Sequence, residues 1–120
     1  MPKKIMIVDD ELHIVKYLSN IFTDQGYAVC AAPDGEEAFQ MLEKEKPDLV
    51  TLDLQMPHEA GPKFYMRLRE NVKYKDLPIV VISGMSAPHK AIKKAAAVVN
   101  KPFEPDDLVE TIKGIIGPAE

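Results

Sequence analysis

The amino-acid sequence predicts an α/β fold with one five-stranded parallel sheet and helices on both of its faces. Short apolar runs rich in β-branched residues alternate along the chain with longer segments whose apolar residues recur at helical spacing. The short runs are continuously apolar, which is typical of strands buried on both faces of a parallel sheet. A chain of 120 residues has the length of one domain, and we expect a single domain over residues 1–120.

The first half of the chain contains two strand and helix units. Residues 4–8 form the first apolar run, and residues 12–22 follow with apolar side chains at helical spacing. Gly26 is placed to end that helix. A short strand is expected over residues 28–31, and the next helix should end before Pro47, because the residue before a proline disfavours helical geometry.

The second half repeats the alternation three more times. A strand is expected over residues 49–52, followed by a helix over residues 63–72 with Pro62 at its first position. The next strand is expected over residues 78–82 and a short fourth helix over residues 88–95. A weak strand over residues 97–99 precedes the last helix, which starts after Pro105 and ends at Gly117.

Strands that alternate with helices predict right-handed crossovers and therefore a doubly wound arrangement. For five strands the leading candidate is the flavodoxin-like order 2-1-3-4-5. In that order, ligands bind at the carboxyl ends of strands one and three. Those are the places where Asp9, Asp10 and Asp53 stand in the sequence.

Composition and charge narrow the range of partners and locations. The net charge of −4 argues against nucleic acid or an acidic membrane surface as a direct partner. Cys30 is the only cysteine, which favours a reducing compartment. The chain also has no apolar run near the roughly 20 residues that span a bilayer. We therefore expect a cytoplasmic protein.

Polar side chains follow four of the apolar runs at the point where each ends. Asp9 and Asp10 follow the first run, Asp53 the third, and Ser83 the fourth, while Lys101 comes two residues after the fifth. A single aspartate here is most often a helix cap, as Asp10 could be. Carboxylates that converge, however, repel one another unless a cation neutralises them, and Mg²⁺ prefers such oxygen ligands.

These residue types suit the transfer of a phosphoryl group. A positioned carboxylate such as Asp53 can attack phosphorus and form an acyl phosphate. Lys101 can neutralise charge on the phosphoryl oxygens, and Ser83 can donate its hydroxyl. Seen alone, a serine after a strand is usually a turn residue and a lysine before a proline is usually on the surface. Their joint position beside the carboxylates favours a shared site.

The chain resembles the receiver domains of two-component response regulators over essentially its whole length. The resemblance rests on four motifs: Ile7-Val8-Asp9-Asp10-Glu11, Asp53-Leu54-Gln55-Met56-Pro57, Val81-Ile82-Ser83-Gly84 and Lys101-Pro102-Phe103. It implies that Asp53 is the phosphoacceptor, that Ser83 is the switch hydroxyl and that Lys101 contacts the phosphate. It also implies a magnesium site, with Mn²⁺ as a possible substitute, formed by Asp9, Asp10, Asp53 and the backbone carbonyl of Gln55. The family further has a cis peptide bond at the position of Lys101-Pro102.

The resemblance also implies a reaction and partners. A sensor histidine kinase or a histidine phosphotransfer protein would donate the phosphoryl group, and the 4-aspartylphosphate would switch binding to a downstream protein that the sequence does not name. Only self-phosphotransfer and self-dephosphorylation are expected, so the domain would not be an enzyme in the usual sense. We expect either a monomer or a homodimer that depends on phosphorylation.

Three features depart from the family pattern, of which the minor one is Ala60, at a position where the family often has aspartate. Val98 occupies the position where the family usually has an aromatic switch residue, and the segment between Ser83 and Lys101 is shorter by about one helical turn. The fourth helix is therefore expected to be short or displaced. We hypothesise that the domain signals through another face or through a rearranged version of the usual one. Mapping amide-shift changes on phosphorylation would test this.

Three other functions compete with the phosphoacceptor. The first is a receiver-like interaction domain that no longer cycles phosphate. The missing switch aromatic and the shortened segment favour this alternative, and the intact set of site residues opposes it. A metal-dependent phosphohydrolase would need a second aspartate where Gln55 stands. A flavodoxin-type flavin carrier would need a phosphate-binding loop rich in serine, threonine or glycine after the first strand.

Overall fold

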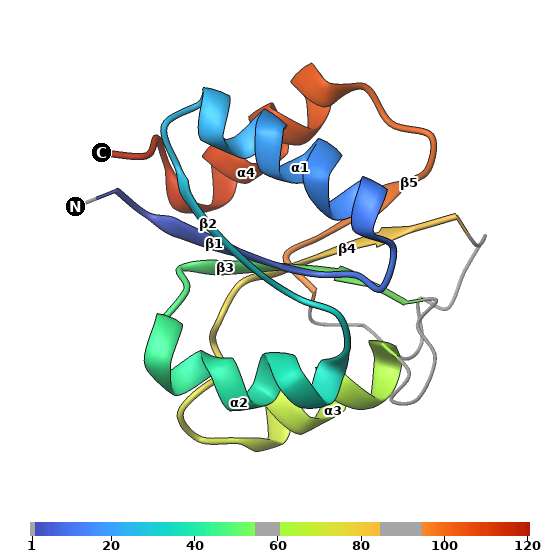
Figure 1. Ribbon diagram of the computed structural model, residues 1–120. Coiled ribbons are helices and arrows are strands. Elements are labelled where there is room, and N and C mark those ends of the chain that lie inside the picture. Colours follow the sequence, from blue (N-terminus) through green and yellow to red (C-terminus); the bar gives the residue numbers. More distant parts are fainter. Residues whose placement is uncertain (1, 55–60, 85–94) are drawn as a thin grey trace.

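The computed structural model describes residues 2–54, 61–84 and 95–120, and it has three layers with a parallel sheet in the middle (Figure 1). The five strands are β1 (Lys4–Val8), β2 (Ala28–Ala32), β3 (Leu49–Asp53), β4 (Ile79–Ser83) and β5 (Ala97–Asn100). The described helices are α1 (Leu12–Asp24), α2 (Gly35–Glu45), α3 (Gly61–Glu70) and α4 (Pro105–Ile116). The strand order is β2-β1-β3-β4-β5, which confirms the predicted doubly wound topology.

Each strand sends alternate side chains to opposite faces of the sheet, and each face has its own core. Ile5 and Ile7 of β1 lie in the core beneath α1 and α4, whereas Met6 and Val8 lie in the core beneath α2 and α3. All four side chains are at most 1% exposed. Burial on both faces explains why the strands read as continuous apolar runs.

The predicted elements are present in the described residues, but several boundaries differ. Pro62 is the second residue of α3 and not the first, because α3 already begins at Gly61. The same helix ends at Glu70, two residues before the predicted end. The side chain of Arg69 donates to the backbone carbonyls of Lys75 and Leu77, so the chain turns back towards β4 there. The predicted helix over residues 88–95 lies almost wholly outside the described residues.

Local contacts define the ends of α1 and α2. Gly26 follows α1 with a φ of 92°, as expected for a glycine that ends a helix. The Asp34 carboxylate accepts a hydrogen bond from the backbone N–H of Glu37 at 2.8 Å and caps α2. Lys46 ends α2 with a left-handed φ of 47°.

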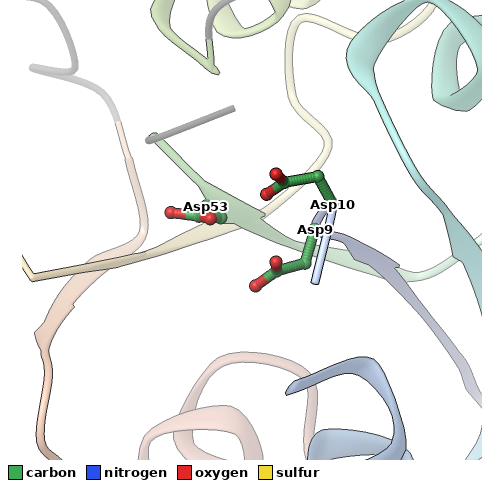
Figure 2. A group of neighbouring side chains, drawn as sticks. All are labelled: Asp9, Asp10 and Asp53. Carbon is green, nitrogen blue, oxygen red and sulfur yellow. The ribbon is translucent and has the colours of Figure 1, made fainter. Parts of the chain in front are cut away.

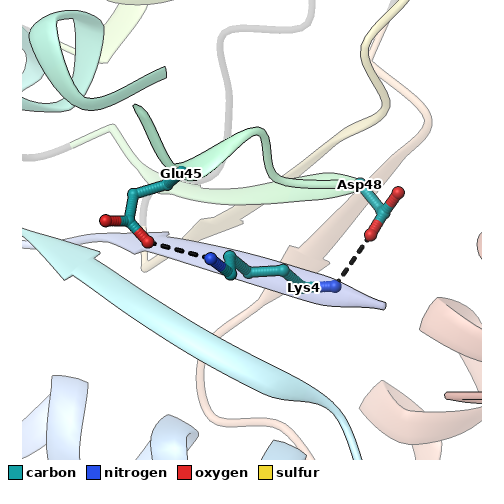
Figure 3. Close-up of polar contacts among 3 residues, drawn as sticks. All are labelled: Lys4, Glu45 and Asp48. Carbon is teal, nitrogen blue, oxygen red and sulfur yellow. Dashed lines mark hydrogen bonds and ion pairs between the residues drawn. The ribbon is translucent and has the colours of Figure 1, made fainter. Parts of the chain in front are cut away.

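Lys4 ties the start of β1 to the connection between α2 and β3 (Figure 3). Its ammonium group lies 2.9 Å from Oε1 of Glu45, and its backbone N–H donates to Oδ2 of Asp48 at 2.8 Å. The two chain termini lie side by side (Figure 1), and the backbone N–H of Lys3 donates to the carbonyl of Ala119 at 2.9 Å. Of the helices in the described part of the chain, none is long and apolar enough to cross a membrane.

The strand register places the candidate site residues at one edge of the sheet. Val8 is in register with Leu52, so Asp9 and Asp53 occupy equivalent positions at the ends of neighbouring strands. Asp53 is in register with Ile82, the residue before Ser83. Ser83 is in register with Asn100, the residue before Lys101.

Candidate functional site

Three carboxylates converge where β1 and β3 end (Figure 2). One carboxylate oxygen from each of Asp9, Asp10 and Asp53 lies within 4.8 Å of the other two. Asp9 and Asp53 are buried, with 4% and 3% of their surface exposed, whereas Asp10 is exposed. The cluster therefore combines two fixed acids with one that faces solvent.

Asp9 is held in place by the chain that follows it. Its Oδ1 accepts a hydrogen bond from the backbone N–H of Glu11 at 2.9 Å. The N-cap position of α1 is occupied by Glu11, which makes no side-chain cap. The alternative that Asp10 caps α1 is therefore wrong, because the turn before the helix is stabilised by Asp9 instead.

The pKa of Asp9 is raised from 3.8 to about 6. Burial is the main cause, because a desolvated carboxylate loses favourable contacts with water. The negative charges of Asp53 and Asp10 raise this pKa further. The Glu11 N–H and the Lys101 ammonium oppose the shift by favouring the ionised form. A cation bound among the three acids would act in the same direction as Lys101.

Asp53 is the last residue of β3, a strand flanked on both sides by others. Its Oδ1 lies 4.0 Å from the ammonium nitrogen of Lys101, whose side chain is 23% exposed. Lys101 follows β5 directly, and the peptide bond between Lys101 and Pro102 is cis, as predicted. The buried Asp53 carboxylate therefore lies opposite the Lys101 ammonium group, which remains accessible to solvent.

The structure brings together four of the predicted site residues, namely Asp9, Asp10, Asp53 and Lys101. The backbone of Ser83 ends β4 at the same edge of the sheet. The Ser83 side chain and the whole of Gln55 lie outside the part that the structure describes, so their roles stay predictions. Val98 lies in β5, paired with Val81, and is 36% exposed.

Sequence reasoning missed the contribution of Gly61. A Cβ atom at this position would lie 2.7 Å from the carbonyl oxygen of Asp53 and 2.6 Å from Cα of Leu54. The start of α3 therefore packs directly on the backbone that carries Asp53. The Gly61-Pro62 pair was a signal for a helix start, but only the folded structure shows the close approach.

The oxygen donors fit a hard divalent cation. Mg²⁺ is bound in proteins through one or two carboxylates and keeps several waters, often sharing phosphate oxygens with a substrate. Two buried carboxylates beside one exposed carboxylate supply such ligands, and their mutual repulsion would be relieved by the cation. The site can therefore hold a metal next to a buried potential nucleophile and a lysine.

The comparison with known families agrees with this geometry. The model of the response regulator receiver domain matches residues 5–113. This chain belongs to that family. Receiver domains act in two-component signalling, and their partners are kinases or phosphotransfer proteins.

Individual relatives extend the match along the chain. Protein Rrf1 of Nitratidesulfovibrio vulgaris is 32% identical over 88% of this chain and 76% of its own length. The polar-differentiation response regulator DivK of Brucella anthropi is 27% identical over 99% of this chain and 100% of its own length. The chemotaxis protein CheY4 of Vibrio cholerae superposes with a TM-score of 0.88 and 31% identity, covering 96% of this chain and 99% of that one. The receiver domain spans about half the length of other relatives, which are transcriptional regulators.

Proposed function

We propose that Asp53 accepts a phosphoryl group from the phosphohistidine of a sensor histidine kinase or of a phosphotransfer protein. The resulting aspartyl phosphate would change which protein the domain binds. One observation carries the proposal: the Asp53 carboxylate is buried at a strand end, with two more carboxylates within 4.8 Å and an ammonium group at 4.0 Å. An aspartate that only faces solvent would be exposed and would not require charged groups this close to it.

Asp9, Asp10, Asp53 and the backbone carbonyl of Gln55 would hold the metal, with Mg²⁺ as the expected ion and Mn²⁺ as a substitute. When bound, the cation neutralises charge on the phosphoryl oxygens and on the acids around them. The donor set contains only oxygen, as hard cations require. The raised pKa of Asp9 supports the same view, because burial, and to a smaller extent the neighbouring acids, disfavour the ionised form that a bound cation would stabilise.

Three residues of the chain would have separate roles in the transfer of the phosphoryl group. A carboxylate oxygen of Asp53 attacks phosphorus, and the bond from phosphorus to the donor's imidazole nitrogen breaks as the new P–O bond forms. Lys101 holds a phosphoryl oxygen with its positive charge, and the Ser83 hydroxyl donates a hydrogen bond to another. Attack by water later releases inorganic phosphate and restores the Asp53 carboxylate. The domain acts only on itself, so it is a signalling phosphoacceptor.

Labelling with a small phosphodonor tests the proposal. Acetyl phosphate with Mg²⁺ should add one phosphoryl group to the wild type, measured by intact mass, and chelation of the metal should abolish the adduct. Asp53→Asn should take up no label. Asp24→Asn is the matched control, because Asp24 is an exposed residue at the end of α1, away from the cluster, and should be labelled like the wild type.

Two outcomes would overturn the proposal. A wild-type protein that stays unlabelled, and that also fails to bind beryllofluoride in an amide-shift titration, would favour the interaction domain that no longer cycles phosphate. Full labelling of Asp53→Asn would assign the phosphoryl group to another residue. The beryllofluoride titration also reports which surface responds, and so tests the expectation of an altered output face.

A further inference from the structure

A cavity of about 460 Å³ lies away from the aspartate cluster, where α2 ends and the segment between α3 and β4 passes. Leu42, Pro47, Tyr74 and Leu77 form its apolar walls. β3 and β4 begin just after Pro47 and Leu77, so the cavity lies at the edge of the sheet opposite Asp53. Its volume falls within the range of roughly 300–1,000 Å³ that small-molecule sites have.

Side chains outside the cavity pack against its apolar wall. The Tyr74 ring packs edge-on against the Phe39 ring, with 6.0 Å between the centroids and 79° between the planes. The guanidinium of Arg67 in turn lies over the Phe39 ring at 4.3 Å from its centroid. Two backbone hydrogen bonds, from the N–H of Tyr74 to Asn71 and from the N–H of Leu77 to Tyr74, fix the segment. The cavity is therefore preformed, which lowers the cost of binding.

Lys46 lies at the edge of the cavity in an unusual conformation. Among the described residues it is the one non-glycine residue with a positive φ, at 47°. Its backbone N–H caps α2 by donating to the Leu42 carbonyl at 2.9 Å. Glycine is the usual residue at such a position because it adopts this conformation without steric cost. A strained conformation retained at a cavity points to a function for the side chain. The Lys46 ammonium makes no direct ion pair with the described residues. After the larger effect of Lys73, the positive charge of Lys46 also helps to lower the pKa of Glu43, which lines the cavity.

A second lysine at the cavity, Lys73, takes part only in a weak ion pair. Lys73 forms an ion pair with Glu43, and both residues line the cavity. Their side chains are 64% and 67% exposed, and ion pairs this exposed are weak because water and salt screen them. An incoming anion can therefore replace Glu43 as the partner of Lys73 at little cost. The charged lining of two lysines and one glutamate favours an anion.

We propose that this cavity binds a small aromatic acid, with its flat apolar body against Leu42, Tyr74 and Leu77 and its anionic group at Lys46 and Lys73. The apolar walls exclude a bare inorganic anion, and the lysines disfavour a cation. Binding does not depend on phosphorylation of Asp53, which lies at the other edge of the sheet.

A fluorescence titration with two matched probes tests this. The probe 8-anilinonaphthalene-1-sulfonate carries the aromatic body and an anion, whereas N-phenyl-1-naphthylamine has the same rings without the charge. The sulfonate should bind the wild type at one saturable site, and at least about threefold more tightly than the neutral amine, a preference of the size expected for a charge-assisted contact at a partly exposed site. Asp53→Asn should bind it like the wild type.

Variants locate the site. Lys46→Gly should weaken sulfonate binding by about three- to tenfold, without lowering the melting temperature, because glycine suits the left-handed backbone. Lys44→Gln removes the same charge from an exposed residue of α2 that does not line the cavity, and should leave the affinity unchanged. Glu43→Gln should tighten binding by about twofold to threefold, because it frees Lys73.

The relative affinities of the two probes and of the variants decide whether the proposal holds. It is overturned if the sulfonate shows no saturable binding, or if the neutral amine binds as tightly. It is also overturned if Lys46→Gly and Lys44→Gln weaken binding equally, because the charge effect would then be general. A melting temperature of Lys46→Gly equal to or above that of the wild type ensures that a loss of affinity is not a loss of fold.

Discussion

At the scale of single residues, Asp9 shows that the site lowers the free energy of unfolding of the metal-free domain at neutral pH. Its folded-state pKa of about 6 lies above its ordinary value of 3.8, so between these values the folded state binds more protons than the unfolded state. The contribution of Asp9 to the free energy of unfolding therefore falls as the pH rises through this window. At pH 7 the ionised Asp9 destabilises the fold, and a bound cation would offset that cost.

We predict that Asp9→Asn raises the free energy of unfolding of the metal-free domain at pH 7.5 by about 1–3 kcal/mol. The amide oxygen of asparagine can still accept the Glu11 N–H, so the turn before α1 is kept. The gain should be smaller at pH 5 and absent below about pH 3, where Asp9 is protonated in both the folded and the unfolded state. Urea unfolding in the presence of a chelator measures it. The exposed Asp24→Asn is the control, and a gain from Asp9→Asn that does not vary with pH would contradict the assignment.

At the scale of elements, the junction between β3 and α3 determines how the Asp53 backbone is held. The first residue of α3 has no side chain, and the helix therefore packs on the Asp53 carbonyl oxygen. Gly114 in α4 is the useful contrast, because a Cβ there would meet nothing within 4 Å. The two glycines lie in helices but differ in what a methyl group would contact.

We predict opposite effects for the two alanine substitutions. Gly61→Ala should lower the free energy of unfolding by about 1–3 kcal/mol, because the methyl group forces α3 away from β3. Gly114→Ala should raise it by about 0.5–1 kcal/mol, because alanine favours an exposed helix. Urea unfolding measures both. Gly61→Ala should also shift the Asp53 amide resonance, and a stable variant with an unshifted resonance would show that the close approach is unimportant.

The same elements show what the sequence could predict and what required the fold. Continuous apolar runs identified the strands, and the parallel arrangement alone brings their carboxyl ends together, which is why Asp9, Asp53 and Lys101 could be predicted to meet. Helix ends were predicted less well, because tertiary contacts determine them. The end of α3 depends on the bonds from Arg69 to carbonyls in the next segment, and no local pattern encodes them. The hydrogen bond from the Glu11 N–H to the Asp9 carboxylate likewise depends on how the chain turns after β1.

At the scale of the whole molecule, the site joins the two cores. β1 and β3 contribute side chains to both cores; Asp9 directly follows β1, and Asp53 is the last residue of β3. A ligand that binds only the folded cluster must therefore stabilise the domain as a whole, by an amount that grows with the ratio of its concentration to its dissociation constant. Thermal stability is then a measure of metal binding that does not require phosphorylation.

We predict that Mg²⁺ at about ten times its dissociation constant stabilises the domain by about 1.4 kcal/mol, which raises the melting temperature by roughly 4–7 °C. Added salt would also screen the repulsion among the carboxylates, so NaCl of equal ionic strength is the necessary reference. Asp10→Asn is the sharpest variant, because Asp10 is exposed and its loss should alter the metal-free fold little while removing one ligand. If NaCl raised the melting temperature as much as MgCl₂, or if Asp10→Asn responded like the wild type, the cluster would be an acidic patch and not a metal site.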